Sequence, residues 1–506
     1  MKRVSEATIP AVLGPNASRS GSLYRQLYES IREQVLFGHF SPGQKMPSSR
    51  ILAADLGVSR NTVLNAFDQL KAEGYLEGTS GSGTYVARAL PDEMTQAPKA
   101  RVARKPAQCV TGPLSRFGSN ITKIDAARAR TSFLVRPFQP GIPAVDAFPF
   151  DVWARISNSH WKRRSSGLLS YGQPAGYPPL RKAVADYLRV GRAVHCDPEQ
   201  VIIVSGAQEA IDLTVRLLID PGDSVWVEDP TYPGARAVLN AASAKLIPVP
   251  VDEGGLSVAE GISRGPDARL VYTTPCHQFP LGTAMAAPRR LELLDWAAKS
   301  NAHILEDDYD SEFRYSTRPL PALQSLDQAG SVIYFGTFSK VLFPSLRLGY
   351  LVAPPDLVDA FMIAKAVTDR ESPTIEQAIL AEFILEGHFG RHIRRMRALY
   401  LERLEIFLDS ARAELSERIE LPRPGAGMHA VALFPPGFDD RSVAARLTAV
   451  GVSSMPLSVC SLAQPRAAGL VLGFGAYGSR QTRLGMRKLA AVLNKEVGAR
   501  TTLISN

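Results

Sequence analysis

The chain has 506 residues, of which 45% are hydrophobic, and it carries a net charge of +9. This length exceeds one typical domain and this hydrophobic share can fill large cores, so global disorder is excluded and two or three domains are expected. Residues 1–90 have a balance of +3 and residues 91–130 a balance of +5, which indicates an anionic polymer as partner of the first quarter, with a solubilising basic segment as the alternative.

Cysteine spacing and hydropathy narrow the class further. The four cysteines, Cys109, Cys196, Cys276 and Cys460, lie far apart, so neither a metal site nor a disulfide framework is expected. This usage fits a reducing cytoplasm. The chain starts without an apolar segment of signal-peptide type, and no apolar stretch approaches the roughly 18 residues that span a bilayer. We therefore expect a soluble cytoplasmic protein without a membrane partner.

The first predicted elements are three helices followed by a hairpin. Apolar residues recur four apart from Leu23 to Val35, which predicts a helix. Residues 48–50 begin a second helix and Ser59 caps a third, each with one apolar face. Two short strands joined by a glycine-rich turn follow over residues 74–86. This order predicts a helix-turn-helix with a β wing, an α+β unit over residues 20–88.

A helix-turn-helix places the first residues of its last helix nearest the bases of the major groove. Arginine pairs with guanine and asparagine with adenine, each through two hydrogen bonds. Residues at the start of the preceding helix contact backbone or bases, and the tip of a wing brings main-chain amides to phosphate. The expected DNA contacts are Arg50, Ser59, Arg60, Asn61, Thr62, Ser82, Gly83 and Thr84.

Four segments in this order resemble the GntR-type winged helix. They are MPSSR at 46–50, LAADLGVSRNTV at 52–63, GYL at 74–76 and GSGTYV at 81–86. The resemblance implies that double-stranded operator DNA is the partner of this unit. The alternative is a helical dimerisation module that carries a hairpin.

Residues 89–135 mix Pro, Ala, Gly, Ser and scattered basic residues with little periodicity. This composition predicts a basic linker that is flexible or loosely docked. Its basic residues either contact DNA phosphates or merely solvate a tether. Residues 136–506 then form the last predicted domain.

Strand-like apolar runs alternate with helix-like stretches in that domain. The runs are 201–204, 224–227, 244–249, 270–273, 303–305, 332–335 and 348–351. Such alternation predicts an α/β fold around a mainly parallel sheet. Ligand contacts are expected beyond the strand ends, where loops and helix N-termini converge.

Residues 337–349, TFSKVLFPSLRLG, contain the groups needed to anchor a phosphorylated aldehyde. The amine of Lys340 can form a Schiff base with a carbonyl. The hydroxyls of Thr337 and Ser339 can hydrogen-bond a phosphate, and Arg347 can bind it through a planar fork of donors. This segment therefore predicts the catalytic or sensing centre.

Other residues at predicted strand ends fit the same ligand. Ala207 and Gln208 open a helix whose free amides attract phosphate, although a plain strand-to-helix turn would look the same. Asp307 would hold a pyridine nitrogen protonated, and Tyr309 would hydrogen-bond the ring hydroxyl oxygen. An acidic strand end is more often a cap or a solvated turn. Tyr232 would stack on the ring, although a core tyrosine would give the same pattern.

In combination, these segments resemble the fold-type I aminotransferases in sequence order. They are YGQPAG at 171–176, SGAQ at 205–208, DPTY at 229–232, TPCHQFPLG at 274–282, EDDYDSEF at 306–313 and SK at 339–340 with Arg347. The resemblance implies pyridoxal 5′-phosphate on Lys340, and it implies that Tyr171 reaches the cofactor phosphate of the neighbouring subunit. The cofactor-binding residues that it implies are Lys340, Asp307, Tyr309, Thr337, Ser339, Arg347, Ala207, Gln208, Tyr232 and Tyr171. His277 and Gln278 are expected near the ring, with their roles left open.

A GntR-type head on an aminotransferase-like body resembles the MocR subfamily of bacterial regulators. This resemblance implies a homodimer in which each head lies against the partner's body. We expect a transcriptional regulator that senses pyridoxal phosphate or an amine effector through a Schiff base at Lys340. The alternative is an active aminotransferase with a non-regulatory head, and a nucleoid-type DNA binder is a third hypothesis.

Two departures from the aminotransferase pattern bear on catalysis. Aminotransferases for α-amino acids keep a C-terminal arginine for the substrate carboxylate, whereas GLVLGFG at 469–475 contains none and Arg466 only precedes it. Gly234 stands where some amine-sensing members place an arginine. Both departures argue against efficient transamination and against γ-aminobutyrate recognition, while a sensor of the cofactor itself needs neither arginine. We expect at most residual transaminase activity.

Overall fold

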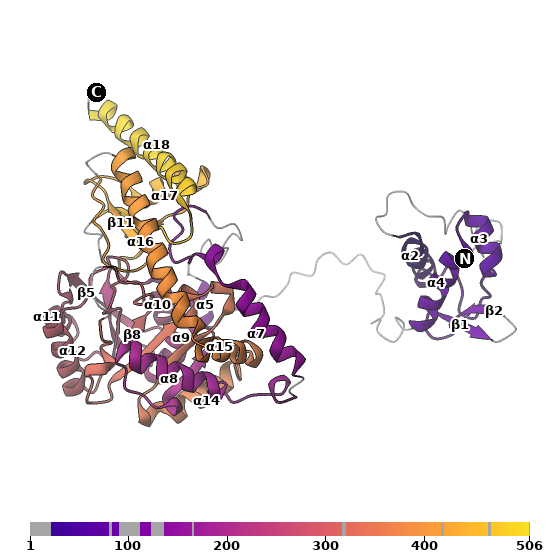
Figure 1. Cartoon of the computed structure of the whole chain (residues 1–506), viewed down its shortest axis with the longest axis horizontal. Coiled ribbons are helices and arrows are strands. Elements are labelled where there is room, and N and C mark those ends of the chain that lie inside the picture. Colours follow the sequence, from indigo (N-terminus) through magenta and orange to yellow (C-terminus); the bar gives the residue numbers. More distant parts are fainter. Residues whose placement is uncertain are drawn as a thin grey trace. The chain divides into compact units, whose positions relative to one another are not determined.

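The computed structural model describes residues 22–79, 83–90, 112–122, 136–163, 166–315, 320–415, 419–463 and 467–504. The chain divides into two compact units, Met1–Gly112 and Pro113–Asn506 (Figure 1). Each unit has hydrophobic cores of its own. Within the residues that the structure describes, none of the helices is both long and apolar enough to cross a membrane.

The first unit is the predicted winged helix-turn-helix. Its elements are α2 Leu23–Leu36, α3 Ser49–Leu56, α4 Arg60–Ala72 and the antiparallel strands β1 Leu76–Thr79 and β2 Gly83–Val86. The apolar residues that predicted the helices face one core, in which Ile31, Leu52 and Leu70 are fully buried. Ser48 and Ser59 cap α3 and α4, because each hydroxyl accepts a hydrogen bond from an amide three residues further on.

The second unit is built on an eight-stranded sheet in the order β3-β10-β9-β8-β7-β4-β5-β6. Its strands are β3 Val201–Val204, β4 Ser224–Asp229, β5 Lys245–Asp252, β6 Gly255–Leu256, β7 Leu270–Thr273, β8 His303–Asp308, β9 Val332–Thr337 and β10 Gly349–Val352. The neighbouring pairs from β9 to β5 are all parallel, whereas β10 runs antiparallel to both of its neighbours and β6 antiparallel to β5. The predicted mainly parallel sheet is confirmed. Strands β3, β7, β9 and β10 are buried along their whole length, which explains their continuous apolar runs.

Helices cover both faces of this sheet. They are α7 Phe150–Lys162, α8 Pro178–Arg192, α9 Ala207–Leu218, α10 Pro233–Ala241, α11 Val258–Arg264, α12 Ala287–Ser300, α13 Phe338–Val341, α14 Val358–Thr368 and α15 Thr374–Leu385. One core lies between the sheet and α9, α10 and α14, and another beneath α11 and α12. Trp226 of β4 and Trp296 of α12 stack in the second core with ring centroids 3.8 Å apart.

A smaller antiparallel sheet, in the order β11-β13-β12, follows near the C-terminus. Its region comprises α16 His388–Glu414, β11 His429–Leu433, α17 Asp440–Ala449, β12 Met455–Pro456, β13 Gly469–Gly473 and α18 Ser479–Ile504. The long helix α16 runs from the large sheet to this region, where it packs beside α18 (Figure 1). The first residue of β11 thereby reaches the carboxyl edge of the large sheet.

Part of the predicted linker is ordered on the second unit. Residues Arg116–Thr122 form the short helix α5, which packs beside α10. The side-chain amide of Asn120 donates a hydrogen bond of 3.0 Å to the hydroxyl of Ser243, just beyond the end of α10. None of the residues of α5 is buried, so the docking is superficial.

The separate cores give a testable expectation for stability. We expect Leu70→Ala to destabilise the winged helix by about 2–5 kcal/mol, because the buried side chain leaves a cavity. Calorimetry of the full chain should then show one unfolding transition moving to lower temperature while the other stays in place. Asn65→Ala, at an exposed position of the same helix, is the control. An equal downward shift of every transition would contradict two independently stabilised units.

Candidate cofactor site and DNA-binding face

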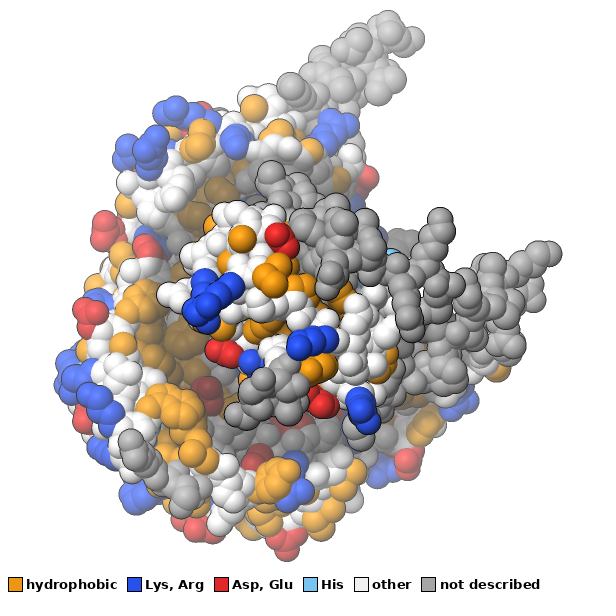
Figure 2. All heavy atoms as spheres, turned by 90° about the vertical axis from the view of Figure 1, so that its right-hand side faces the viewer, with side chains coloured by type: hydrophobic (Ala, Val, Ile, Leu, Met, Phe, Trp, Pro, Cys, Tyr) orange, Lys and Arg blue, Asp and Glu red, His pale blue; other side chains and the backbone are white. Residues whose placement is uncertain are grey.

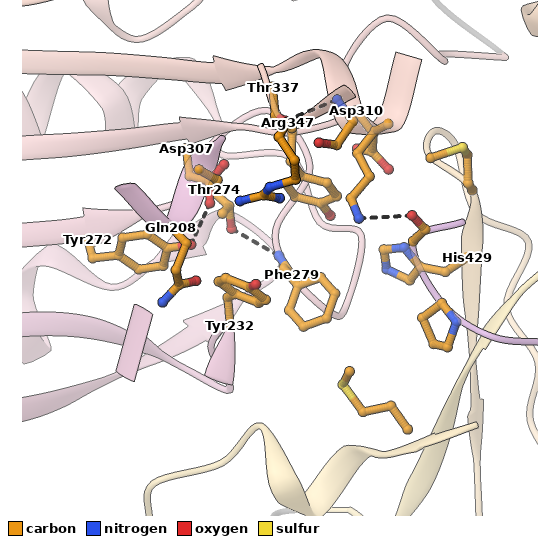
Figure 3. Close-up of a pocket in the computed structure, with 18 residues that line it drawn as sticks. Gln208, Tyr232, Tyr272, Thr274, Phe279, Asp307, Asp310, Thr337, Arg347 and His429 are labelled. Atoms are coloured by element: carbon orange, nitrogen blue, oxygen red, sulfur yellow. Dashed lines mark hydrogen bonds between the residues drawn. The ribbon is translucent and has the colours of Figure 1, made fainter. Parts of the chain in front are cut away.

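A cavity of about 320 Å³ lies at the carboxyl edge of the large sheet, where the loops that follow the parallel strands begin. It is lined by Pro140, Gly141, Ala207, Gln208, Tyr232, Tyr272, Thr274, Phe279, Asp307, Tyr309, Asp310, Thr337, Ser339, Lys340, Arg347, Met428, His429 and Met455. Figure 3 shows Tyr272, Asp307 and Gln208 on one side of this space and His429 on the opposite side. Nine of the ten predicted cofactor residues line it, and Tyr171 does not.

Lys340 enters the cavity from α13, the short helix that begins where β9 ends. Its Nζ donates a hydrogen bond of 2.9 Å to the carbonyl of Gly141. Burial lowers the pKa of the Lys340 ammonium, while Asp310 and Asp307 act in the opposite direction. A lowered pKa favours the neutral amine, which is the nucleophilic form. Gly141 has φ +76° and a Cβ there would lie 2.6 Å from Nζ, so a larger residue would be strained and would displace the Lys340 amine.

Asp307 is the next-to-last residue of β8 and is almost completely buried. The Tyr272 hydroxyl donates a hydrogen bond of 2.7 Å to Oδ2, while Oδ1 has no hydrogen-bond partner among the described residues. Burial raises the pKa of the Asp307 carboxyl to about 7. A buried acceptor without a partner is costly, so this site is suited to a positively charged N–H group of a ligand.

Three elements bring donors for an anion to the same side of the cavity. The Ser339 hydroxyl is buried without a partner among the described residues, and Thr337 caps α13 by accepting a hydrogen bond from the Ser339 amide. Helix α9 begins at Ala207, and the first amides of a helix have no acceptor within it. The Arg347 guanidinium lies 3.5 Å from where a Cβ on Gly206 would sit, and Gly206 has φ +110°. This set of donors matches a phosphate.

An ion cluster around the buried Lys365 stands behind the first turn of α9. Glu209 accepts a hydrogen bond from the Ser205 amide through Oε2 and pairs through Oε1 with Lys365 of α14 at 2.8 Å. The fully buried Lys365 ammonium also pairs with Asp369 at 2.8 Å. Lys365 therefore offsets a carboxylate that would otherwise oppose an anion at the start of α9.

The predicted aromatic residues take different positions. Tyr232 lines the cavity just before α10 and meets the Phe279 ring edge-on, with centroids 5.7 Å apart. The Tyr309 hydroxyl lies 3.0 Å from His277 Nδ1. Tyr171 is 76% exposed, and its ring packs under the Arg370 guanidinium at 4.0 Å. An exposed position outside the cavity agrees with the expectation that Tyr171 serves a neighbouring subunit, which stays a prediction.

Two residues that were expected near the ring lie behind the wall of the cavity. His277 Nδ1 is 2.8 Å from Asp310 Oδ1, and neither His277 nor Gln278 is among the lining residues. Gln278 donates through its side-chain amide to Glu228, to the Phe279 carbonyl and to the carbonyl of Pro230 in the loop after β4. Both residues therefore hold the loop after β7 in shape.

The structure adds lining residues that sequence reasoning missed. They include Tyr272, Thr274, Phe279, Asp310, Met428, His429 and Met455. Tyr272 and Asp310 stand in quoted or neighbouring segments, and a tyrosine inside a buried strand was a usable signal. His429 and Met455 come from the small C-terminal sheet, more than 80 residues after Lys340 in the chain. No local pattern connects these residues to the large sheet.

The predicted DNA contacts gather at the start of α4. Arg50, Arg60 and Asn61 are exposed, and the Arg60 Nε donates a hydrogen bond of 3.4 Å to the Ser49 hydroxyl. Ser59 and Thr62 bind each other through their hydroxyls at 2.8 Å and cap the helix. Figure 2 shows a face of this unit on which Lys and Arg side chains stand among hydrophobic and uncharged groups, together with some Asp and Glu side chains.

The wing brings a further basic residue to its edge. Gly83 and Thr84 lie at the start of β2, while Ser82 lies outside the described residues. Lys45 packs over the Tyr85 ring at 5.8 Å, and a Cβ on Gly83 would lie 2.9 Å from Lys45 Cε. Lys45 is exposed and had not been predicted as a DNA contact.

Comparison with known families identifies both units. Residues 23–86 match the bacterial regulatory proteins of the gntR family, and residues 143–466 match the aminotransferases of class I and II. The fold is shared with α-aminoadipate aminotransferase LysN from Thermus thermophilus, solved in complex with N-(5′-phosphopyridoxyl)-L-leucine. The TM-score is 0.70 at 27% identity, over 76% of this chain and 100% of that one. The class is thus a GntR-type regulator fused to a fold-type I aminotransferase domain.

Full-length relatives show which family this combination belongs to. The chain is 42% identical to the probable rhizopine catabolism regulatory protein MocR of Rhizobium meliloti, over 92% of this chain and 93% of that protein. It is 32% identical to the pyridoxine biosynthesis transcriptional regulator PdxR of Corynebacterium glutamicum, over 93% and 95%. The chain therefore belongs to the MocR subfamily of GntR-type transcriptional regulators.

The buried carboxyl of Asp307 gives a pH-dependent prediction. A rise of its folded-state pKa from 3.8 to about 7 means that ionisation costs stability, and this cost grows as the pH rises through that interval. Without cofactor, we expect Asp307→Asn to raise the free energy of unfolding by at most about 4 kcal/mol at pH 8, by about 2 kcal/mol at pH 5, and not at all near pH 3. Urea unfolding at each pH measures this difference.

The same substitution should weaken cofactor binding, because the amide cannot pair with a cationic ring nitrogen. If Asp307→Asn raises the free energy of unfolding but weakens cofactor binding, the carboxyl serves the ligand. A carboxyl with a structural role would instead be needed for stability. A variant that is less stable than the parent chain at pH 8 would contradict this interpretation.

Lys365 provides a test of the anion site that does not depend on chemistry at Lys340. We expect Lys365→Met to lower the affinity for pyridoxal phosphate about tenfold, because Glu209 is left uncompensated beside the phosphate. Affinity for pyridoxal, which has no phosphate, should change by less than about twofold. Adding Glu209→Gln should restore binding of the phosphorylated form. Equal losses for both ligands, measured by fluorescence titration, would contradict this role.

Proposed function

We propose that this chain is a cytoplasmic transcriptional regulator that binds operator DNA through α4 and the wing and holds pyridoxal 5′-phosphate at Lys340. One observation carries the proposal. The cavity combines an amine at Lys340, an unpartnered carboxyl oxygen at Asp307 and an unpartnered hydroxyl at Ser339. The aldehyde, the ring nitrogen and the phosphate of this cofactor would satisfy these three groups together.

Different residues of the cavity would hold different parts of the cofactor. Asp307 would keep a proton on the ring nitrogen, and Tyr272 holds that carboxyl in place through its hydroxyl. Ser339, Thr337, Arg347 and the first amides of α9 would hold the phosphate, with Tyr232 against the ring. When bound, pyridoxal phosphate supplies an aldehyde carbon that condenses with a primary amine as a Schiff base. Lys340 presents that amine in a site that favours its neutral form.

Regulation would follow from differential binding. A ligand that favours one arrangement of head and body shifts the population towards it, and operator affinity changes with that population. The signal is either the cofactor itself or an amine that competes with Lys340 for it. We expect a homodimer that reads two half-sites, with each head beside the partner's body.

The alternative is a working aminotransferase with a head that does not regulate, and the intact set of cofactor-directed residues favours it. The two hypotheses differ in the expected products. An enzyme would convert an amino acid and a keto acid steadily and would show no preference among DNA sequences. A regulator would show sequence preference that responds to the ligand.

A matched pair of variants tests the proposal. Lys340→Ala should abolish the yellow absorbance of the loaded protein, because the anchoring amine is lost, while DNA binding in the absence of cofactor persists. Arg60→Ala should weaken operator binding by about 1–3 kcal/mol and leave the absorbance unchanged. Footprinting of the chain's own upstream DNA, with and without pyridoxal phosphate, provides the operator. Unchanged absorbance in Lys340→Ala, or equal binding of all DNA sequences by the parent chain, would refute the corresponding half.

A further inference from the structure

We propose that the end of the cavity beyond Lys340 accepts a small primary amine that carries no carboxylate. This inference rests on the proposed function, because the cofactor defines the opposite end through Asp307. It is argued from the charges and hydrogen-bonding groups that surround His429, which faces Asp307 across the cavity (Figure 3).

Both cationic side chains of the cavity already have another role, so neither is available to pair with a ligand carboxylate. Among the described lining residues, Lys340 and Arg347 are the cationic side chains. Lys340 is the anchoring amine, and Arg347 lies beside Gly206 at the start of α9, on the anion side. A carboxylate on the ligand would thus lose its water without gaining a charged partner, which is strongly unfavourable.

Neighbouring arginines are engaged elsewhere. Arg192 is buried against Asp308 with a nitrogen–oxygen distance of 2.7 Å, and Arg290 binds the carbonyls of Pro275 and Pro321. Neither arginine is a lining residue. Arg466, which the sequence suggests as a substitute for the missing arginine, lies outside the described residues.

A carboxylate of the protein stands at this end instead. Asp310 lines the cavity and is buried, with Oδ1 at 2.8 Å from His277 Nδ1. The negative charge of Asp310 raises the pKa of Lys340 and so favours its ammonium form. The same charge attracts a ligand ammonium and repels a ligand carboxylate.

His429 contributes a neutral hydrogen-bonding group. Its Nε2 donates a hydrogen bond of 3.0 Å to the Pro280 carbonyl, which leaves Nδ1 as an acceptor. Burial, assisted by His277, lowers the pKa of His429 to about 4, so the ring carries no charge at neutral pH. It cannot replace an arginine as a carboxylate clamp, but it can accept a hydrogen bond from a hydroxyl group.

The remaining wall is apolar and adaptable. Phe279 packs against His429 with centroids 5.5 Å apart, and the thioethers of Met428 and Met455 complete the lining. Methionine side chains adjust to ligands of irregular shape. Because the cofactor shares the cavity of about 320 Å³, the amine must be small. An apolar or hydroxyl-bearing body fits this surface, and an anionic body does not.

Matched amines test the inference on the full chain loaded with pyridoxal phosphate. We would titrate n-butylamine, 4-amino-1-butanol and 4-aminobutyrate, which share one chain length and one amine, and follow the cofactor absorbance. We expect both carboxylate-free amines to act at concentrations at least about tenfold lower than 4-aminobutyrate. An equal or stronger response to 4-aminobutyrate would overturn the inference.

Two variants connect the preference to this end of the cavity. His429→Arg places a cation opposite Asp307, so the response to 4-aminobutyrate should strengthen at least about tenfold relative to n-butylamine. Asp310→Asn removes the repelling charge and should narrow the preference, and it tests the same idea if His429→Arg fails to load cofactor. An unchanged preference in both loaded variants would overturn the assignment.

Arg466→Ala tests the remaining alternative, in which Arg466 binds a ligand carboxylate. If the parent chain responds equally to 4-aminobutyrate and this variant does not, Arg466 supplies a carboxylate clamp and the inference is wrong. Failure of the parent chain to take up pyridoxal phosphate at all would instead refute the proposed function. The two failures are therefore distinguishable.

Discussion

The cost of leaving Asp307 buried and ionised is the constraint on which the site depends. This carboxyl lies at the end of a central parallel strand, receives a hydrogen bond from Tyr272, and retains one oxygen without a partner among the described residues. Burial raises the pKa of the group to about 7, which means that ionisation of this carboxyl is unfavourable. A ligand with a cationic ring nitrogen would offset that cost, and its binding would then stabilise the second unit.

Charge compensation also governs the anion side. The start of α9 offers free amides, but it carries Glu209, and the buried Lys365 of α14 offsets this carboxylate. Asp369, the residue that follows α14, completes the cluster, and the next residue, Arg370, covers the exposed ring of Tyr171. A continuous set of contacts therefore joins the first turn of α9, where we propose that the phosphate binds, to a tyrosine at the surface.

The two units solve different physical problems. The winged helix buries a small core, and two serine caps fix the ends of α3 and α4, so the exposed Arg60 and Asn61 project from a rigid helix start. The body instead has a cavity in which Asp307 Oδ1 and the Ser339 hydroxyl are buried without hydrogen-bond partners among the described residues. Helix α5 of the predicted linker packs on α10, whose preceding residue Tyr232 lines that cavity. The segment after the head thus rests on an element of the site.

The sequence by itself determined the winged helix, the mainly parallel sheet and the segments around Lys340, because hydrophobic periodicity, caps and strand-end motifs are local properties. It also placed Asp307, Ser339 and Arg347 in one hypothesis through a resemblance of ordered motifs. Only the tertiary structure brought His429 and Met455 to the same cavity, since they come from a separate antiparallel sheet. Likewise, the pairing of Lys365 with Glu209 and the burial that shifts the pKa of Asp307 arise from packing between distant segments, which no local pattern encodes.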